Sequence, residues 1–310
     1  MRLTDTVKGI LANYGSDNPG TKANLARMLM TGRLAGTGKM IILPVDQGLE
    51  HSPARSFSVN PAGYDPLYHH QLAIDAGLNA YAAPLGALEC SADAFPGEIP
   101  LILKVNHSTS VYRNNEAPDQ AVFATVGDAV RLGCSAIGFT IYPSSDQQFA
   151  MYEEIAEMCR EAKAVGLPTV IWSYPRGGNL SKAGETAVDI DGYAAYIAAT
   201  CGAHIIKVKL PSDHIEQPEG KKAFEAGNID ISTQAARVKE IMRSALGGRR
   251  IVIFSGGAAK GADAVLDDAR AIRDGGGNGL IIGRNSFQRP YDDAMKLLGG
   301  LIDIFLGKVQ

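Results

Sequence analysis

Short apolar stretches recur along the chain, and segments with helical periodicity lie between them. Such an alternation is typical of parallel strands joined by crossover helices. We predict strands at 40–45, 78–83, 99–105, 135–141, 169–174, 204–209, 250–254 and 280–283. We predict helices at 68–76, 119–132, 145–164, 191–200, 233–244 and 262–274.

Glycine marks the point where several of these helices should end. Gly77, Gly133, Gly202 and Gly276 each stand between a helical pattern and the next apolar stretch. A glycine commonly closes a helix, and a short loop then leads into the strand. Eight such units predict an α/β fold, a closed (β/α)₈ TIM barrel. A doubly wound open sheet is the alternative, but the early G-x-G-x-x-G turn of dinucleotide-binding folds is missing.

The segment before the first strand has a different pattern. Residues 25–29 look helical and residues 32–38 are loose and rich in glycine. We expect residues 1–38 to form a short N-terminal helical extension that covers the floor of a barrel spanning residues 39–310. This predicts one catalytic domain and no second one.

Composition and charge narrow the class of protein. The 310 residues carry 30 Lys+Arg and 33 Asp+Glu, and no basic run exceeds two residues, which argues against nucleic acid as a partner. No apolar run approaches a membrane span, and residues 1–14 lack the apolar core of a secretory signal. We therefore expect no membrane partner and a cytoplasmic location. The four cysteines have no C-x-x-C spacing, so they are expected to be reduced packing residues.

Two lysines on the predicted sixth strand are the first candidates for chemistry. Side chains alternate along a strand, so Lys207 and Lys209 share one face, while Val208 lies on the other. The apolar face should pack on helices, which turns both amines into the barrel. Burial and like charge then favour a neutral amine, a nucleophile of the Schiff-base type. The alternative is a strand end whose lysines reach solvent or pair with acids.

Two further strands end in candidate site residues. Asp46 follows the apolar first strand and is a candidate to bind a hydroxyl or to pair with a lysine. The alternative is that Asp46 caps a helix or a turn. Trp172 and Tyr174 share a face of the fifth strand, and Arg176 follows them. Tyr174 should lie beside Lys207 and carry protons, with Trp172 as an apolar wall and Arg176 as an anion contact. The alternative is an aromatic core layer with a surface arginine.

The last two strands end in loops suited to phosphate. One loop holds Ser255, Gly256 and Gly257, and the other holds Gly283 and Arg284. Barrels often bind phosphate there, where glycine lets backbone N–H groups approach the anion. Arg284 adds a forked donor, which a pair of purely structural turns would not need. Lys260, just beyond the first loop, is expected to shape the start of a helix.

Metal chemistry is the main competing class. No two of the six histidines show the i, i+4 spacing of H-E-x-x-H, so we predict no metal site and no cofactor. His107 follows the third strand and either faces the mouth of the barrel or is a satisfied turn histidine.

Several segments together resemble the archaeal-type class I fructose-bisphosphate aldolases, which also occur in bacteria. They are TGRLAGTG at 31–38, ILPVDQGLEH at 42–51, WSYPR at 172–176, IIKVK at 205–209, SGG at 255–257 and GR at 283–284. The resemblance runs from about residue 30 to the end. A sister group on the same skeleton handles other ketose phosphates and typically lacks the second lysine, so Lys209 favours the bisphosphate aldolases.

The resemblance implies a role for each matching position. Lys207 would form the Schiff base, Tyr174 would donate and accept protons, and Asp46 and Trp172 would contact the substrate. Arg176 and Lys209 would add polar contacts, and Ser255, Gly256, Gly257, Gly283 and Arg284 would cradle phosphate. The expected reaction is reversible cleavage of fructose 1,6-bisphosphate, as in glycolysis or gluconeogenesis, by a large homo-oligomer. Metal-dependent aldolases and isomerases, and non-catalytic phosphosugar-binding barrels, remain alternatives.

Overall fold

The computed structural model describes residues 2–111, 117–257 and 259–309, and in these residues eight parallel strands close into a barrel. The strands are β1 Met40–Pro44, β2 Ala80–Pro84, β3 Leu101–Lys104, β6 Ala136–Ile141, β7 Thr169–Ser173, β8 Ile205–Val208, β9 Ile251–Ser255 and β10 Gly279–Ile281. Each predicted strand overlaps one of them. The predicted (β/α)₈ TIM barrel is confirmed.

The strands follow chain order around the barrel. The closed order is β1-β10-β9-β8-β7-β6-β3-β2, and β10 returns to β1 with Met40 opposite Gly279. Ile41 and Leu43 point out and pack in the large cluster beneath the helices, whereas Met40 and Ile42 point in. Because both faces are buried, the strands form continuous apolar runs in the sequence.

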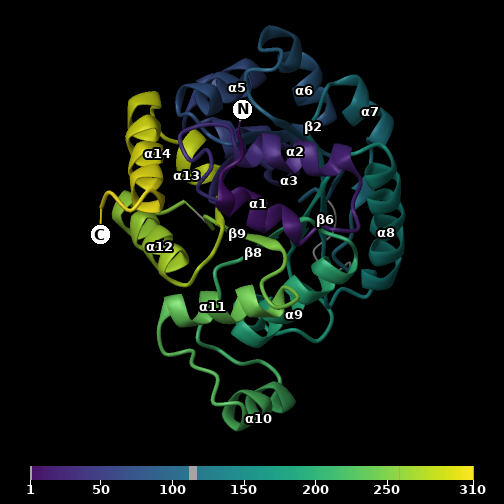
Figure 1. Cartoon of the computed structure of the whole chain (residues 1–310), viewed down its shortest axis with the longest axis vertical. Coiled ribbons are helices and arrows are strands. Elements are labelled where there is room, and N and C mark those ends of the chain that lie inside the picture. The colour runs from purple at the N-terminus through teal and green to yellow at the C-terminus, as the bar shows by residue number, and fades with distance from the viewer. Residues whose placement is uncertain (1, 112–116, 258, 310) are drawn as a thin grey trace.

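Helices surround the barrel in the order of the chain (Figure 1). The longer ones are α5 Pro66–Asp75, α8 Gln148–Ala164, α9 Val188–Thr200, α11 Gln234–Ser244, α12 Ala262–Asp274 and α14 Tyr291–Phe305. Shorter helices are α6 Leu85–Ser91, α7 Val126–Arg131, α10 Pro218–Ala226 and α13 Arg284–Phe287. Short 3₁₀ turns lie at η1 Pro61–Tyr64, η2 Ala92–Ala94 and η3 Gly184–Thr186.

The helix predicted at 119–132 is wrong in its first half. Helix α7 begins only at Val126, because Thr125 and Asp128 form a capping box whose side chains accept from each other's backbone N–H groups. Before it, β5 Ala121–Val122 pairs antiparallel with β4 Asn106–His107. This small hairpin extends the connection after β3 over the mouth of the barrel, the end at which the strands finish.

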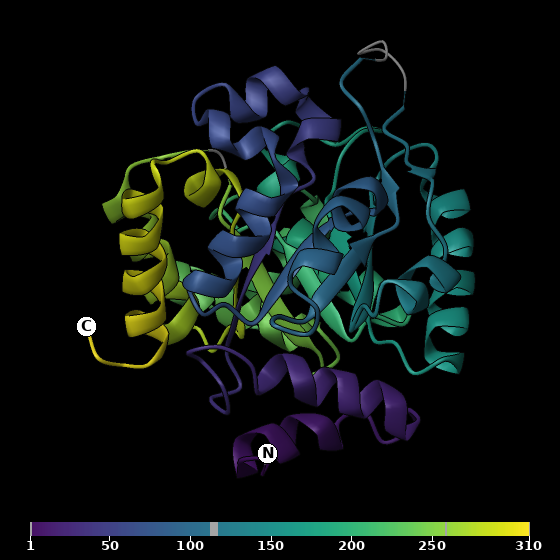
Figure 2. The same cartoon turned by 90° about the horizontal axis from the view of Figure 1, so that it is seen from above.

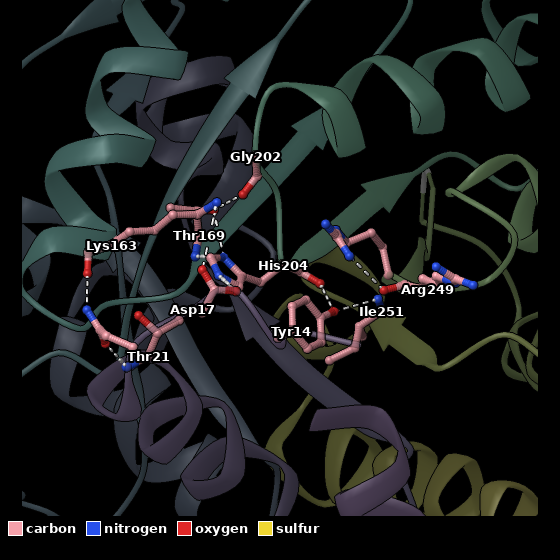
Figure 3. Close-up of polar contacts among 11 residues, drawn as sticks. Tyr14, Asp17, Thr21, Lys163, Thr169, Gly202, His204, Arg249 and Ile251 are labelled. Atoms are coloured by element: carbon pink, nitrogen blue, oxygen red, sulfur yellow. Dashed lines mark hydrogen bonds and ion pairs between the residues drawn. The ribbon is translucent and has the colours of Figure 1, made fainter. Parts of the chain in front are cut away.

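The N-terminal helices lie across the floor, the opposite end of the barrel. Helices α1 Asp5–Ala12 and α2 Pro19–Leu29 lie beneath it, while α3 Gln47–His51 and α4 Pro53–Phe57 lie at the mouth (Figure 2). The apolar side chains of α1 and α2 join the inward-facing strand residues in one cluster. Tyr14 donates to the carbonyl of His204 at 2.6 Å and accepts from the N–H of Ile251 at 3.1 Å (Figure 3). The division of the chain at residue 38 stays a prediction.

Candidate active site

A cavity of about 710 Å³ opens at the mouth of the barrel. Every site residue proposed from the sequence lines it: Asp46, Trp172, Tyr174, Arg176, Lys207, Lys209, Ser255, Gly256, Gly257, Gly283 and Arg284. The parallel strands all finish at this end, so residues distant in the chain meet here. The structure thus brings the predicted set together, while the role of each residue stays a prediction.

Lys207 lies deep in this cavity. Its residue is 6% exposed, and its Nζ lies 5.6 Å from the ring centroid of Trp172 and 5.3 Å from that of Tyr174. No hydrogen bond or ion pair reaches its amine from the described residues. Burial lowers the pKa of Lys207 to about 8. A neutral amine is therefore far more accessible than for a lysine in solvent.

The like charge beside Lys207 is not the one predicted. Strand β8 ends at Val208, and Lys209 just beyond it donates to Glu185 Oε2 at 2.9 Å. Lys209 therefore lines the cavity as half of an ion pair. The lysine that lowers the pKa of Lys207 is Lys104, on β3.

Tyr174 lies beside Lys207, as the strand order predicted. β7 pairs with β8, and Trp172 is opposite Lys207 in the register. Burial raises the pKa of Tyr174 well above its ordinary value, although a hydrogen bond with the Ser255 side chain lowers it. The phenol is therefore protonated at neutral pH and able to donate a proton.

Asp46 forms a close pair with His107. The two side chains meet at 3.2 Å, between Asp46 Oδ2 and His107 Nε2. Burial raises the pKa of Asp46, but the contact with His107 and the charges of Lys104 and Lys207 together hold that pKa well below its ordinary value. Asp46 makes no side-chain capping bond to α3, which removes the cap alternative. It is an ionised carboxylate facing buried amines.

Trp172 forms an inner wall of the cavity. It is 2% exposed, and its indole Nε1 has no hydrogen-bond partner among the described residues. Gly138 on the neighbouring strand makes room for the ring, since a Cβ there would lie 2.4 Å from Trp172 Cζ3. An unpaired buried N–H beside a cavity is a donor available to a bound molecule.

The two glycine loops meet at the rim of the cavity. Arg284 Nη2 donates to the carbonyl of Gly257 at 3.4 Å, and Gly257 has a φ of +69°. Gly283 is required for another reason: a Cβ there would lie 2.8 Å from the Pro44 carbonyl. Close packing against β1 is therefore enough to explain glycine at 283. The Arg176 guanidinium lies 5.1 Å from the centroid of the Tyr142 ring.

Sequence reasoning missed some residues of this site. Lys104 ends a buried strand, the same signal that drew attention to Lys207, but it stands alone without a second lysine. Glu50, on α3, also lines the cavity. Lys260 also lines the cavity, although its amine pairs with Asp268.

Among the described residues, no group of three or more His, Cys, Asp or Glu side chains is placed to hold a metal ion. Within the same residues, every helix is too short or too polar to cross a membrane.

Comparison with known proteins gives consistent matches. The family described as DeoC/LacD family aldolase matches residues 40–289. A protein of Thermoproteus tenax named fructose-bisphosphate aldolase class 1 is 38% identical over 274 residues, covering 88% of this chain and 92% of its own length. A Chlamydia muridarum protein named probable fructose-bisphosphate aldolase class 1 is 33% identical, covering 97% of this chain and 89% of its own.

A solved structure also matches over most of its length. It is an archaeal fructose-1,6-bisphosphate aldolase whose catalytic lysine is covalently bound to the carbinolamine intermediate of the substrate. The TM-score is 0.75 at 34% identity, covering 91% of this chain and 98% of that one.

Proposed function

Because this chain belongs to the DeoC/LacD family of aldolases and, within it, to the class 1 fructose-bisphosphate aldolases, we propose that it cleaves fructose 1,6-bisphosphate through a Schiff base on Lys207. The products are dihydroxyacetone phosphate and glyceraldehyde 3-phosphate, and the reaction is reversible. One observation carries the assignment to Lys207: its amine is buried, unpaired among the described residues, and 5.3 Å from the Tyr174 ring.

The first step is attack of the neutral Lys207 amine on the C2 ketone of the substrate. Loss of water from the carbinolamine leaves an iminium, which withdraws electrons from the neighbouring bonds. Asp46 is ionised at this point, and its negative charge stabilises the cationic iminium. A carboxylate with so low a pKa is a poor base, so we assign Asp46 to electrostatic stabilisation and to binding a substrate hydroxyl.

The second step breaks the C3–C4 bond. Its electrons move into the iminium, the C4 hydroxyl gives its proton to a water molecule, and glyceraldehyde 3-phosphate leaves. The remaining enamine of dihydroxyacetone phosphate takes a proton at C3 from Tyr174, whose phenol remains protonated at neutral pH. Water then hydrolyses the imine and frees Lys207, and the Tyr174 phenolate recovers its proton from water.

The remaining cavity residues would bind and orient the sugar. Arg284 with the backbone of Gly256, Gly257 and Gly283 would hold the phosphate nearest the ketone, and Ser255 would add a hydroxyl. Trp172 would offer its unpaired indole N–H to the sugar. Arg176 and Lys209 would be further polar contacts with the substrate.

The test is an assay for cleavage of fructose 1,6-bisphosphate in the presence of EDTA, followed by reduction with borohydride. We expect cleavage to persist in EDTA, and we expect dihydroxyacetone phosphate with borohydride to inactivate the enzyme irreversibly. Loss of activity that zinc restores, without trapping, would instead indicate a metal-dependent aldolase. Binding of the sugar without turnover would indicate a non-catalytic phosphosugar-binding protein.

We also propose that the enzyme is a cytoplasmic homo-oligomer. Helix α10 projects from the barrel and has no buried residues (Figure 1). Phe149 and Tyr193, on neighbouring helices, are 71% and 57% exposed. Surfaces of this kind are typical of subunit contacts. Analytical ultracentrifugation gives the subunit number, and a monomer at micromolar concentration would contradict this proposal.

A further inference from the structure

A second buried lysine lies close to the nucleophile but does not line the cavity. Lys104, at the end of β3, is 1% exposed, and its Nζ lies 5.6 Å from the centroid of the Trp172 ring. The Nζ of Lys207 is at the same distance from that ring. One indole thus has two ammonium-bearing side chains against it. The reaction proposed above uses only Lys207.

We propose that Lys104 is a positioning residue for this reaction: a fixed buried cation that favours the neutral, nucleophilic form of Lys207. The inference rests on the proposed Schiff-base function and adds a source for the reactivity of its lysine. A neighbouring cation is a general means of activating an amine nucleophile. Nothing in the proposed chemistry requires Lys104 to touch the substrate.

Hydrogen bonding decides which of the two amines keeps its proton. The Lys104 amine donates to the carbonyl and to the side-chain Oδ1 of Asn106, the latter at 3.2 Å. Both acceptors stabilise an ammonium ion. Lys207 has no such acceptor among the described residues, so it is the amine that loses its proton more readily.

Asn106 is itself rigidly held. Its Oδ1 accepts from the N–H of Thr140 at 2.7 Å, and its Nδ2 donates to the Thr140 carbonyl at 2.8 Å. Asn106 is completely buried, and these bonds tie it to β6. The acceptors for Lys104 therefore cannot swing toward Lys207. The cation is fixed in place before the substrate binds.

Other charges around the pair act in both directions. Burial is the largest influence and lowers the pKa of Lys207. The charges of Asp46 and Glu50 raise that pKa, and those of Lys104 and Arg284 lower it further. The same two acids raise the pKa of Lys104, which burial lowers to about 8. In the proposed complex the bound phosphate offsets the positive charge of Arg284. Of the two cations, only Lys104 retains its effect in the loaded enzyme.

The experiment compares the pH dependence of kcat/KM in the wild type and in Lys104→Met. Methionine keeps the length and apolar stem of lysine but not its charge. The variant should move the acid limb up by about one pH unit, lose about tenfold in kcat/KM at pH 7, and approach the wild type near pH 10. A loss that is equal at every pH would mean a purely structural role and would overturn the proposal.

Two control variants sharpen the comparison. Lys104→Arg keeps the charge, so its acid limb should stay close to that of the wild type. Lys39→Met removes a part-buried amine at the floor, where Lys39 donates to the Gly277 carbonyl at 2.6 Å. Its acid limb should be unchanged. A shift in Lys39→Met as large as that in Lys104→Met would also overturn the proposal.

The wild type provides a measurement that does not depend on the folding of any variant. Reduction of the enzyme with dihydroxyacetone phosphate by cyanoborohydride, followed from pH 6 to 10, should have a midpoint near 8. A trapping midpoint near the ordinary pKa of lysine would show that the pKa of Lys207 is not lowered, and it would contradict the proposed effect of Lys104. Absence of trapping at every pH would contradict the Schiff-base function itself, which is a different result.

Discussion

Two buried histidine–carboxylate pairs lie at opposite ends of this barrel, and they differ in what surrounds them. At the mouth, His107 Nε2 lies 3.2 Å from Asp46 Oδ2. At the floor, His204 Nε2 lies 3.2 Å from Asp17 Oδ2. The residue types and the distance are the same. What differs is the set of groups around each pair: one pair is structural, and the other lies beside the proposed reaction site.

At the floor both ring nitrogens of the histidine have hydrogen-bond partners. The N–H of Thr169 donates to His204 Nδ1 at 2.9 Å, so a neutral ring carries its proton on Nε2 and donates it to Asp17 (Figure 3). Tyr14 stacks on the His204 ring with centroids 5.4 Å apart. These contacts attach the N-terminal segment to the barrel.

At the mouth the corresponding pair, Asp46 and His107, has a different hydrogen-bond arrangement. His107 Nδ1 lies 2.8 Å from the carbonyl of Ser108, which can only accept, so Nδ1 carries a proton. His107 Nε2 can then donate to Asp46 only from a doubly protonated ring. Unpaired buried groups and a cavity lie beside this pair, including the amine of Lys207 and the indole N–H of Trp172. The pair alone therefore does not mark the functional end; the cavity and the unpaired lysine amine beside it do.

The largest loss of activity is expected from substitution of Lys207 on β8. Lys207→Met should lower cleavage by several orders of magnitude and abolish borohydride trapping, because it removes the nucleophile. Lys209→Met is the matched control: it loses an ion pair with Glu185 but should still be trapped. Turnover and trapping are measured on both. A trappable Lys207→Met would reverse the assignment.

Tyr174→Phe should have the next largest effect. The change removes one hydroxyl and keeps the ring, so folding and imine formation should survive while proton transfer slows by roughly 10²- to 10⁴-fold. Exchange of the C3 proton of dihydroxyacetone phosphate with solvent measures that step, and trapping measures imine formation. Near-normal exchange would show that another group moves the proton, with Asp46 the first to examine.

Arg284→Ala tests the phosphate site and should have a smaller effect. Loss of a hydrogen bond to a charged group is worth about 1.5–3 kcal/mol, so binding of the phosphorylated ketose should weaken by about 10- to 150-fold. Inorganic phosphate should compete with the substrate in the wild type. The measurement is the ratio of kcat/KM for phosphorylated over unphosphorylated substrate. An unchanged ratio would place the phosphate elsewhere.

Asp17→Asn at the floor should have the smallest effect on activity. It weakens the bond to His204, and the free energy of unfolding should fall by about 1–3 kcal/mol while kcat/KM stays within about twofold. Asp46→Asn at the mouth is the matched change and should impair catalysis. Urea unfolding and steady-state kinetics measure both. Equal losses of activity would remove the distinction between the two ends.

The floor variant also has a pH signature. His204 lowers the pKa of Asp17 through its hydrogen bond, so the folded state favours the carboxylate. This stabilisation is present above the unfolded pKa of aspartate and is lost as pH falls through the lower folded pKa. The difference in unfolding free energy between the wild type and Asp17→Asn should therefore shrink in acid. A constant difference would exclude this ionisation as its source.

The barrel could be predicted because its strands are buried on both faces. Such strands form continuous apolar runs, and the closing glycines separate them from the helices. The helix at 119–132 was overpredicted because the contact of β5 with β4 is a tertiary pairing that the local pattern does not contain. The cap at Thr125 and Asp128 was present in the sequence and marks the true start of α7.

The candidate site was predictable where residues follow strand ends. Lys207, Tyr174 and Asp46 meet because parallel strands finish at one end. The pairing of Lys209 with Glu185 was not predictable, since Glu185 lies on η3, within a long connection from β7 to α9 whose path only the fold determines. Lys104 was missed because its neighbour, Lys207, lies on a strand about 100 residues later in the chain.

The central claim is that Lys207 is the one lysine that forms the imine. Borohydride reduction of the wild-type enzyme with dihydroxyacetone phosphate, followed by proteolysis and mass mapping, tests it most directly. The account predicts a single reduced adduct on Lys207, with Lys104 and Lys209 unmodified. An adduct on Lys209 or Lys104, or none on any lysine, would contradict it.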